Sequence, residues 1–342
     1  MKWEQKRLDG CVSSNGKPYI ISLKKGTVNK LLVNFVGGGM SWSEETAARP
    51  ISMSSMLMKK ETFYISDVSS TVLRFMHVGI LKANDPRNPF NDWFVLNIPY
   101  VTADFHIGNN DFAYRSLNGE NKTLYHHGEK NVAAALAVLK TFFPRTPETL
   151  LIMGVSAGAF GCVAHAPVIR NIYPECKNTV VYSEGSFIRS FLWKSIVRDV
   201  WKVNNNLAAY IESDDLIYDL FRYARDNMPK DTRFLHSNSV WDAELSGFMY
   251  KMNHGKKEVC SQALREFHDS LADTVTKLKD ELPNYSYYLT DYGKKNDGTT
   301  PHIFVGSPKL LYGQMQDGVS IADWLREAVE GNLKNVGEKF LP

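Results

Sequence analysis

The residues most suited to chemistry lie at positions 154–158, which read Gly-Val-Ser-Ala-Gly. The apolar run at residues 150–153 predicts a buried strand before them, and the small and apolar residues at 159–164 predict a helix after them. In this strand–turn–helix context the pattern is typical of a nucleophile elbow, a strained turn that exposes a serine hydroxyl beside a helix N-terminus. The pattern therefore predicts attack by Ser156 on an acyl ester. Tight strand–helix packing alone is the alternative interpretation.

A serine nucleophile needs a general base, and hydrolases with this elbow carry their triad in the order serine, acid, histidine. His302 lies in a loop after the turn at residues 296–298 and shortly before the last predicted helix. Its loop position and its late place in the chain make it the preferred base. Of the other histidines after Ser156, His165 is expected on the elbow helix and His236 at a strand end. His254 is expected in a lysine-flanked loop and His268 in a charged helix.

Asp242 is the preferred acid because it ends a strand-like run and stands between the serine and the histidine in the chain. A helix N-cap after a strand is the alternative interpretation of this aspartate. Asp291 and Asp297 lie so near His302 that they would share its loop. The remaining candidates follow the histidine or belong to a charged helical stretch: Asp317, Asp214 and Asp215.

A glycine triplet at residues 37–39 follows the apolar run at 30–36 and fits one side of an oxyanion hole. Such a hole needs two or three convergent backbone N–H groups, and Ala157, the residue after the nucleophile, supplies one of them. A tight turn is the plainer interpretation of the triplet. A phosphate-binding loop is excluded because neither G-x-G-x-x-G nor Gly-Lys-Ser/Thr occurs there.

Strands and amphipathic helices alternate along the chain. Strands are predicted at residues 19–23, 30–36, 93–100, 150–153, 179–182 and 232–235, and helices at 129–143, 264–278 and 321–329. This alternation predicts an α/β fold of the α/β-hydrolase type, with a mostly parallel central sheet covered by helices on both faces. Because such sheets bear their function at the carboxyl ends of the strands, the glycine triplet, Ser156 and Asp242 are expected at one edge.

Composition limits the classes of protein that fit. The 342 residues contain no linker, repeat or low-complexity segment, so one domain over residues 1–342 is expected. A net charge of +3 argues against a nucleic-acid partner. The uncharged stretch 150–169 holds three glycines, His165 and Pro167, which argue against an integral membrane segment. The four cysteines lack metal-type spacing, and no metal or organic cofactor is expected.

The first seven residues contain no apolar segment typical of a signal peptide, although a chain whose leader had been removed would look the same. Four cysteines in so long a chain do not resemble a disulfide scaffold. A cytoplasmic location is therefore favoured, with secretion as the alternative. The sequence indicates no particular oligomeric state.

Further motifs are spread over nearly the whole chain, at residues 11–19, 32–40, 88–93, 183–187 and 238–242, with His302 and Trp324 near the end. Together with the serine motif they resemble the pectin acetylesterase and Notum family of carboxylesterases. The resemblance implies a triad of Ser156, Asp242 and His302. It also implies that the oxyanion donors are the backbone N–H groups of Gly38, Gly39 and Ala157.

Several residues depart from the pattern of that family. Val36 stands where the family has a glutamate, and Met40 where it has a tryptophan. Ser41 and Val101 replace two cysteines, and Asn109 replaces an aspartate. The missing cysteines remove disulfides typical of secreted members, which agrees with a reducing compartment. The missing tryptophan alters the pocket and hence the acyl group that it accepts.

The residues and the resemblance together predict a serine carboxylesterase that acts through an acyl-enzyme on a small ester. Removal of an acetyl group from a carbohydrate is favoured, and a lipid deacylase is the nearer alternative. Helical, aromatic residues within 186–230 form a candidate cap over the site, although such a stripe is more often plain core. A non-catalytic binding protein that retains the hydrolase fold is a further alternative. A nucleotide-binding oxidoreductase ranks far behind because its glycine fingerprint is missing.

Overall fold

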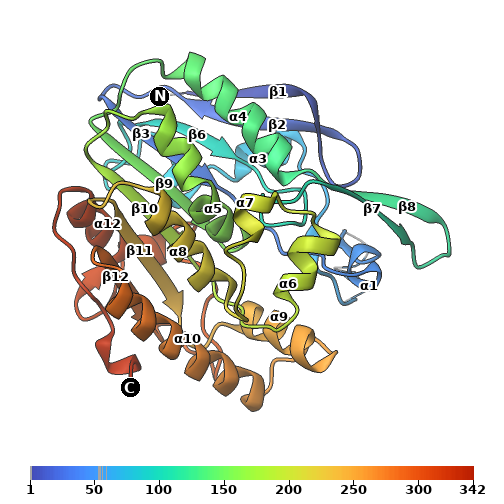
Figure 1. Ribbon diagram of the computed structural model, residues 1–342. Helices are drawn as coiled ribbons and strands as arrows, with labels where there is room; N and C mark the ends of the chain where they lie inside the picture. The colour runs from blue at the N-terminus through green and yellow to red at the C-terminus, as the bar shows by residue number, and fades with distance from the viewer. Residues whose placement is uncertain (1, 53–54, 56, 59) are drawn as a thin grey trace.

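The computed structural model describes residues 2–52, 55, 57–58 and 60–342, and an eight-stranded sheet forms its centre (Figure 1). The strand order is β1-β2-β6-β3-β9-β10-β11-β12. Six neighbouring strands from β6 to β12 are parallel, whereas β1 and β2 join one side in antiparallel pairing. The strands are β1 (Trp3–Val12), β2 (Pro18–Lys24), β3 (Lys30–Phe35), β6 (Phe94–Ile98), β9 (Thr149–Val155), β10 (Thr179–Glu184), β11 (Arg233–Ser239) and β12 (Tyr285–Thr290).

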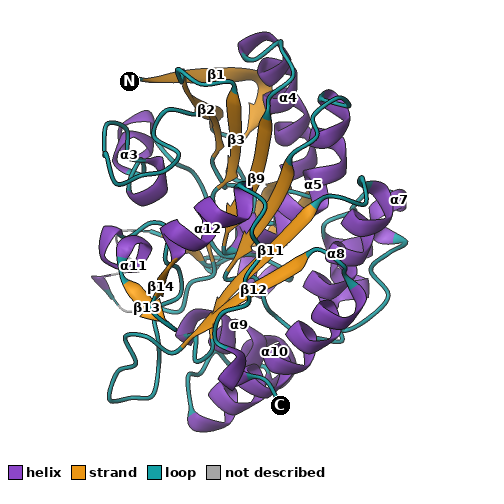
Figure 2. Ribbon diagram, turned by 90° about the vertical axis from the view of Figure 1, so that its left-hand side faces the viewer, coloured by secondary structure: helices purple, strands orange, loops and turns teal. Residues whose placement is uncertain are grey.

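Helices cover both faces of this sheet (Figure 2). On one face lie α4 (Gly128–Phe142), α5 (Ala157–Ile172) and α8 (Leu216–Asn227); on the other lie α3 (Ser70–Phe75), α11 (Pro308–Tyr312) and α12 (Ile321–Val329). Because both faces are covered, β9 and β10 are almost wholly buried, and most of their side chains are apolar. The predicted mostly parallel sheet between helices is confirmed.

Two more helices and several short elements complete the described chain. The helices α9 (Ala243–His254) and α10 (Ser261–Glu281) follow β11 in sequence. Short helical segments are α1 (Glu44–Ala47), α6 (Trp193–Ser195), α7 (Asn205–Ala208), a π-helix (Ile196–Val200) and two 3-10 turns (Gly79–Leu81 and Glu338–Phe340). Three small two-stranded pairs are β4 (Pro50–Ile51) with β5 (Tyr64–Ile65), β7 (Asn110–Arg115) with β8 (Asn121–His126), and β13 (Gln314–Gln316) with β14 (Val319–Ser320).

The amphipathic helices bury the residues that their spacing predicts. In α4, Val132, Leu136 and Leu139 are buried, and α10 buries its apolar side from Leu264 to Leu278. The strands predicted in the sequence are all present, whereas β1, β12 and the β7–β8 hairpin were not predicted. No helix in the described part of the chain is long and apolar enough to cross a membrane. The assignment of the whole chain to one domain stays a prediction.

The two edge strands of the central sheet, β12 and β1, have different neighbours and side chains. Along the outer edge of β12, Val336 accepts a hydrogen bond from Leu289 N at 2.9 Å and donates one to Tyr287 O at 2.9 Å. The strand β1 forms the opposite border and exposes charged side chains, namely Glu4, Lys6, Arg7 and Asp9.

Candidate active site

Ser156 occupies a sharp turn between β9 and α5, the context expected for a nucleophile elbow. Its φ of 54° is uncommon for a residue with a side chain and marks local backbone strain. A Cβ at Gly154 would lie 2.1 Å from the carbonyl oxygen of Gly158, and one at Gly158 would lie 2.2 Å from that of Phe35. Both outer positions of the motif therefore require glycine because the strand, turn and helix pack so closely.

The glycine triplet packs directly against this turn. A Cβ at Gly37 would lie 2.6 Å from the Cβ of Ser156, and Gly39 has a φ of 80° with no space for a side chain beside the Phe63 carbonyl. Gly38, Gly39 and Ala157 line one cavity with Ser156. Their backbone N–H groups donate no hydrogen bond to any described residue, so they are available to an oxyanion near the N-terminus of α5.

Asp242 and His302 meet across 60 residues of sequence. His302 Nδ1 lies 2.5 Å from Asp242 Oδ2, and since a carboxylate only accepts, the proton is on Nδ1. The other carboxylate oxygen, Oδ1, accepts from the backbone N–H groups of Glu244 at 2.8 Å and Leu245 at 2.9 Å. Asp242 is thus the N-cap of α9 and also bonds His302, so the N-cap interpretation is confirmed and is compatible with the role of an acid, which stays a prediction.

The surroundings of His302 stabilise its protonated form. Burial alone would lower the pKa of this imidazole, but the charge of Asp242 and the hydrogen bond to it raise the pKa above its ordinary value. The carboxylates of Glu244 and Glu184 act in the same direction. A base with a raised pKa retains the proton that it takes from a nucleophile more readily.

His302 and Ser156 line the same cavity. No hydrogen bond joins the two side chains among the residues that the structure describes; such bonds are often long until a substrate binds. The imidazole lies against Gly185, where a Cβ would be 3.2 Å from His302 Cε1, and the preceding residue, Glu184, accepts a hydrogen bond from Ser156 N at 2.7 Å. His302 and the Ser156 turn therefore contact adjacent residues at the end of β10, Gly185 and Glu184.

The other histidines lie elsewhere. His165 bonds the carbonyl of His106 from the buried side of α5, and His236 is buried in β11 beside Tyr285. His254 belongs to α9 rather than to the expected loop, because α9 extends to this residue, and it pairs with Glu266. His268 lies on α10, as predicted, beside Asp269.

The remaining aspartates have other partners or other places. Asp297 accepts from Thr299 in its own loop, and Asp317 accepts from Gly337 N. Asp215 caps α8 and bonds Thr274 and Arg189. Among the described aspartates, Asp242 is the one that bonds His302.

The cavity in front of Ser156 has a volume of about 460 Å³ and mostly apolar walls. Its apolar lining includes Met40, Phe63, Phe105, Phe160, Leu245 and Phe248. Lys257 lies 4.3 Å from the ring centroid of Phe248 and 3.7 Å from the Glu244 carboxylate. Apart from Met40, which replaces a tryptophan of the family, these lining residues were not predicted, because they come from separate segments that only the fold brings together.

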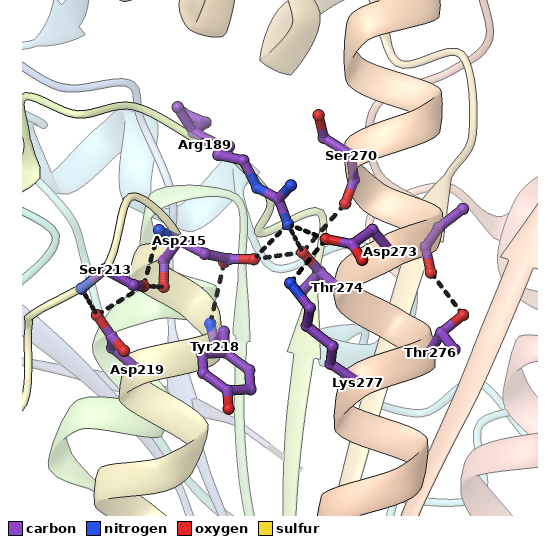
Figure 3. Close-up of polar contacts among 12 residues, drawn as sticks. Arg189, Ser213, Asp215, Tyr218, Asp219, Ser270, Asp273, Thr274, Thr276 and Lys277 are labelled. Atoms are coloured by element: carbon purple, nitrogen blue, oxygen red, sulfur yellow. Dashed lines mark hydrogen bonds and ion pairs between the residues drawn. The ribbon is translucent and has the colours of Figure 1, made fainter.

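The region 186–230 contributes Ile188 to the cavity wall. The neighbouring Arg189 anchors this segment by hydrogen bonds to Asp215 at 3.3 Å, Asp273 at 2.7 Å and Thr274 at 3.0 Å (Figure 3). Trp193 and Trp201 are fully buried in the main core, and α8 packs on α5. The aromatic residues of this segment are mainly core, and a capping role for it stays a prediction.

The described residues include no cluster of three or more His, Cys, Asp or Glu side chains that could hold a metal ion. The four cysteines are free thiols, of which three are buried.

Two solved structures of the Wnt deacylase Notum from Drosophila are similar to this chain over its full length. One shows 16% identity and a TM-score of 0.66, covering 100% of this chain and 97% of the other. The second shows 14% identity and a TM-score of 0.67, covering 100% and 98%. At these identities the likeness concerns the fold, and it confirms the predicted α/β-hydrolase fold. No curated protein sequence matches the chain.

A profile of the pectinacetylesterase family matches residues 6–203. This range holds the glycine triplet and Ser156, whereas Asp242 and His302 lie beyond it. The match covers more than half of the chain and agrees with the resemblance found in the sequence motifs. The chain belongs to the pectinacetylesterase family and is a carboxylic ester hydrolase.

Proposed function

We propose that the protein hydrolyses esters through a triad of Ser156, His302 and Asp242. The observation that carries this proposal is the hydrogen bond that Asp242 accepts from His302, which lines the same cavity as Ser156. Ser156 Oγ attacks the ester carbonyl while His302 Nε2 takes the hydroxyl proton. Asp242 keeps the proton of the imidazole on Nδ1, so that Nε2 is free to act as the base.

The tetrahedral intermediate needs donors for its oxyanion. The backbone N–H groups of Gly38, Gly39 and Ala157, which have no partner among the residues that the structure describes, support this role. The loss of one such donor costs on the order of 100-fold in turnover. His302 then protonates the leaving alcohol. Water, activated by the same imidazole, releases the carboxylic acid from Ser156 and regenerates the free serine.

Labelling with a fluorophosphonate tests the proposal against a binding protein that retains the fold. A serine activated by a neighbouring imidazole attacks phosphorus, so we expect one equivalent of label, mapped by mass spectrometry to the peptide that contains Ser156. Denatured protein is the control, because the elbow geometry is lost in it. Native protein that resists labelling would favour the non-catalytic alternative.

The apolar cavity supports an acyl group larger than acetyl, which would leave most of the space unfilled. A sugar ring needs hydrogen-bonding partners on several sides, but few lining side chains are polar. Besides Ser156 and His302 these are Thr62, Glu244 and Lys257. An apolar acyl ester is therefore the substrate class that the geometry supports best. Acetyl removal from a carbohydrate, which the sequence favours, stays a prediction, as does the cellular compartment.

A chain-length series of p-nitrophenyl esters separates the two acyl groups. Each CH₂ group buried in the cavity contributes about 0.8 kcal/mol, so kcat/KM should rise roughly fourfold per CH₂ from acetate until the cavity is full. Phe248→Trp narrows the cavity and should move the optimum to a shorter ester. Phe191→Trp is the matched control, since Phe191 is 72% exposed and does not line the cavity. Rates that fall from acetate onward would restore the acetyl prediction.

A further inference from the structure

Glu184 is a buried carboxylate at the end of β10 that the proposed mechanism does not use. Its side chain is fully buried, which is costly for a charged group unless strong partners compensate. The strand β10 lies between β9, which leads into Ser156, and β11, which leads toward Asp242. Glu184 therefore stands at the centre of the edge where the triad is assembled.

The backbone of Glu184 holds the nucleophile. Its carbonyl oxygen accepts from Ser156 N at 2.7 Å, which fixes the strained elbow to the neighbouring strand. The next residue, Gly185, donates to Ser237 O at 2.8 Å and has a φ of 65°. A side chain at Gly185 would meet the His302 ring, so the base packs directly on the backbone that carries Glu184.

The side chain of Glu184 holds the loop that carries the base. Its Oε1 accepts from the backbone N–H groups of Phe304 at 2.7 Å and Val305 at 3.2 Å, two and three residues after His302. Its Oε2 accepts from the hydroxyl of Tyr182 at 2.5 Å, which in turn lies 2.8 Å from Ser237 Oγ. One residue thus bonds both the elbow and the histidine loop.

Three donors favour the ionised form of this carboxylate. Burial raises the pKa of Glu184 above its ordinary value, and the Tyr182 hydroxyl and the two backbone N–H groups limit that rise because they donate to the ionised form. The charged groups with the largest effects on the pKa of His302 are Asp242, Glu244 and Glu184, while the cationic Lys257 lines the same cavity and pairs with Glu244. The three carboxylates each favour the imidazolium that forms when the serine proton is taken.

We propose that Glu184 is a positioning residue of this active site, which holds the His302 loop against the Ser156 elbow and adds a second buried negative charge beside the imidazole. This inference rests on the proposed triad. Glu184 then has two effects that can be separated. Its hydrogen bonds hold His302 at its distance from Ser156, and its charge raises the pH at which His302 becomes neutral.

The test is the rate of fluorophosphonate labelling measured against pH. Labelling of the wild type should rise with pH through the pKa of His302, because only the neutral imidazole accepts the serine proton. Glu184→Gln keeps an oxygen for Phe304 N but removes the charge, so the imidazolium is less stable and the rise should move to lower pH by roughly half a unit or more. Glu184→Ala removes the acceptor as well, and the plateau rate should fall about 100-fold because the base is displaced.

Asp219→Asn is the matched control. Asp219 is also fully buried and accepts from two backbone N–H groups, those of Glu212 at 2.9 Å and Ser213 at 2.8 Å, but it lies on α8 outside the cavity. This variant should unfold at a lower temperature, but its labelling rate should keep the wild-type dependence on pH and the wild-type plateau. If Glu184→Gln behaves like the control, the inference is overturned, even where Glu184→Ala fails to fold. Wild-type protein that does not label at Ser156 would instead overturn the proposed triad.

Discussion

Replacing Ser156 by Ala is expected to lower kcat for p-nitrophenyl butyrate by roughly 10⁴- to 10⁶-fold. The alanine lacks the attacking oxygen, and the residual rate would come from the oxyanion donors and from binding alone. KM should change little, because the cavity walls that bind the acyl group are untouched. The measurement is steady-state hydrolysis together with fluorophosphonate labelling, which should disappear in the same variant.

Ser195→Ala controls for the loss of a hydroxyl as such. Ser195 is exposed on α6, and its Oγ bonds the Leu192 carbonyl rather than any residue of the cavity. It should retain wild-type turnover. Hydrolysis that persists in Ser156→Ala, after contaminating esterase has been excluded by active-site titration, would show that another group is the nucleophile.

Asp242→Asn is expected to lower kcat by about 10⁴-fold while the protein stays folded. The amide oxygen can still accept from Glu244 N and Leu245 N, so the N-cap of α9 is retained. The amide NH₂ group then faces His302 and donates to Nδ1 instead of accepting a hydrogen bond from it, so the imidazole is held in the wrong tautomer. Turnover and thermal unfolding, measured on the same preparation, separate these effects.

Asp242→Ala makes the comparison sharper. It removes the helix cap in addition to the acid, which should cost about 1 kcal/mol of unfolding free energy beyond the effect of Asn. Both variants should be similarly slow, yet only Ala should melt at a clearly lower temperature. Unchanged turnover in Asp242→Asn would transfer the role of the acid to Asp291 or Asp297 in the loop of His302.

The sequence was informative where backbone geometry restricts the choice of residue. A Cβ at Gly154 or Gly158 would make contacts of about 2 Å, so both positions require glycine. The elbow can therefore be recognised from the sequence motif. The amphipathic helices α4 and α10 were predictable for a similar reason, since one buried face imposes a period.

The sequence was uninformative where a residue's role depends on partners far away in the chain. Glu184 and Phe304 are 120 residues apart, and nothing in either segment predicts that they bond. The strand β12, with the sequence Tyr-Ser-Tyr-Tyr-Leu-Thr, has no continuous apolar run, and it is buried because β11, α10 and the C-terminal segment surround it. Most of the cavity wall could not be predicted for the same reason, because its residues come from strands, helices and loops that are far apart in the chain.

The borders of the central sheet bear on how the molecule behaves among its own copies. An exposed strand edge offers free amide and carbonyl groups that can recruit a strand from another molecule and begin aggregation. Here Val336 occupies such groups along β12, and a charged row lies along β1, where a second chain would meet desolvation and repulsion. Both borders of the sheet therefore disfavour edge-to-edge pairing between copies of the protein in crowded solution.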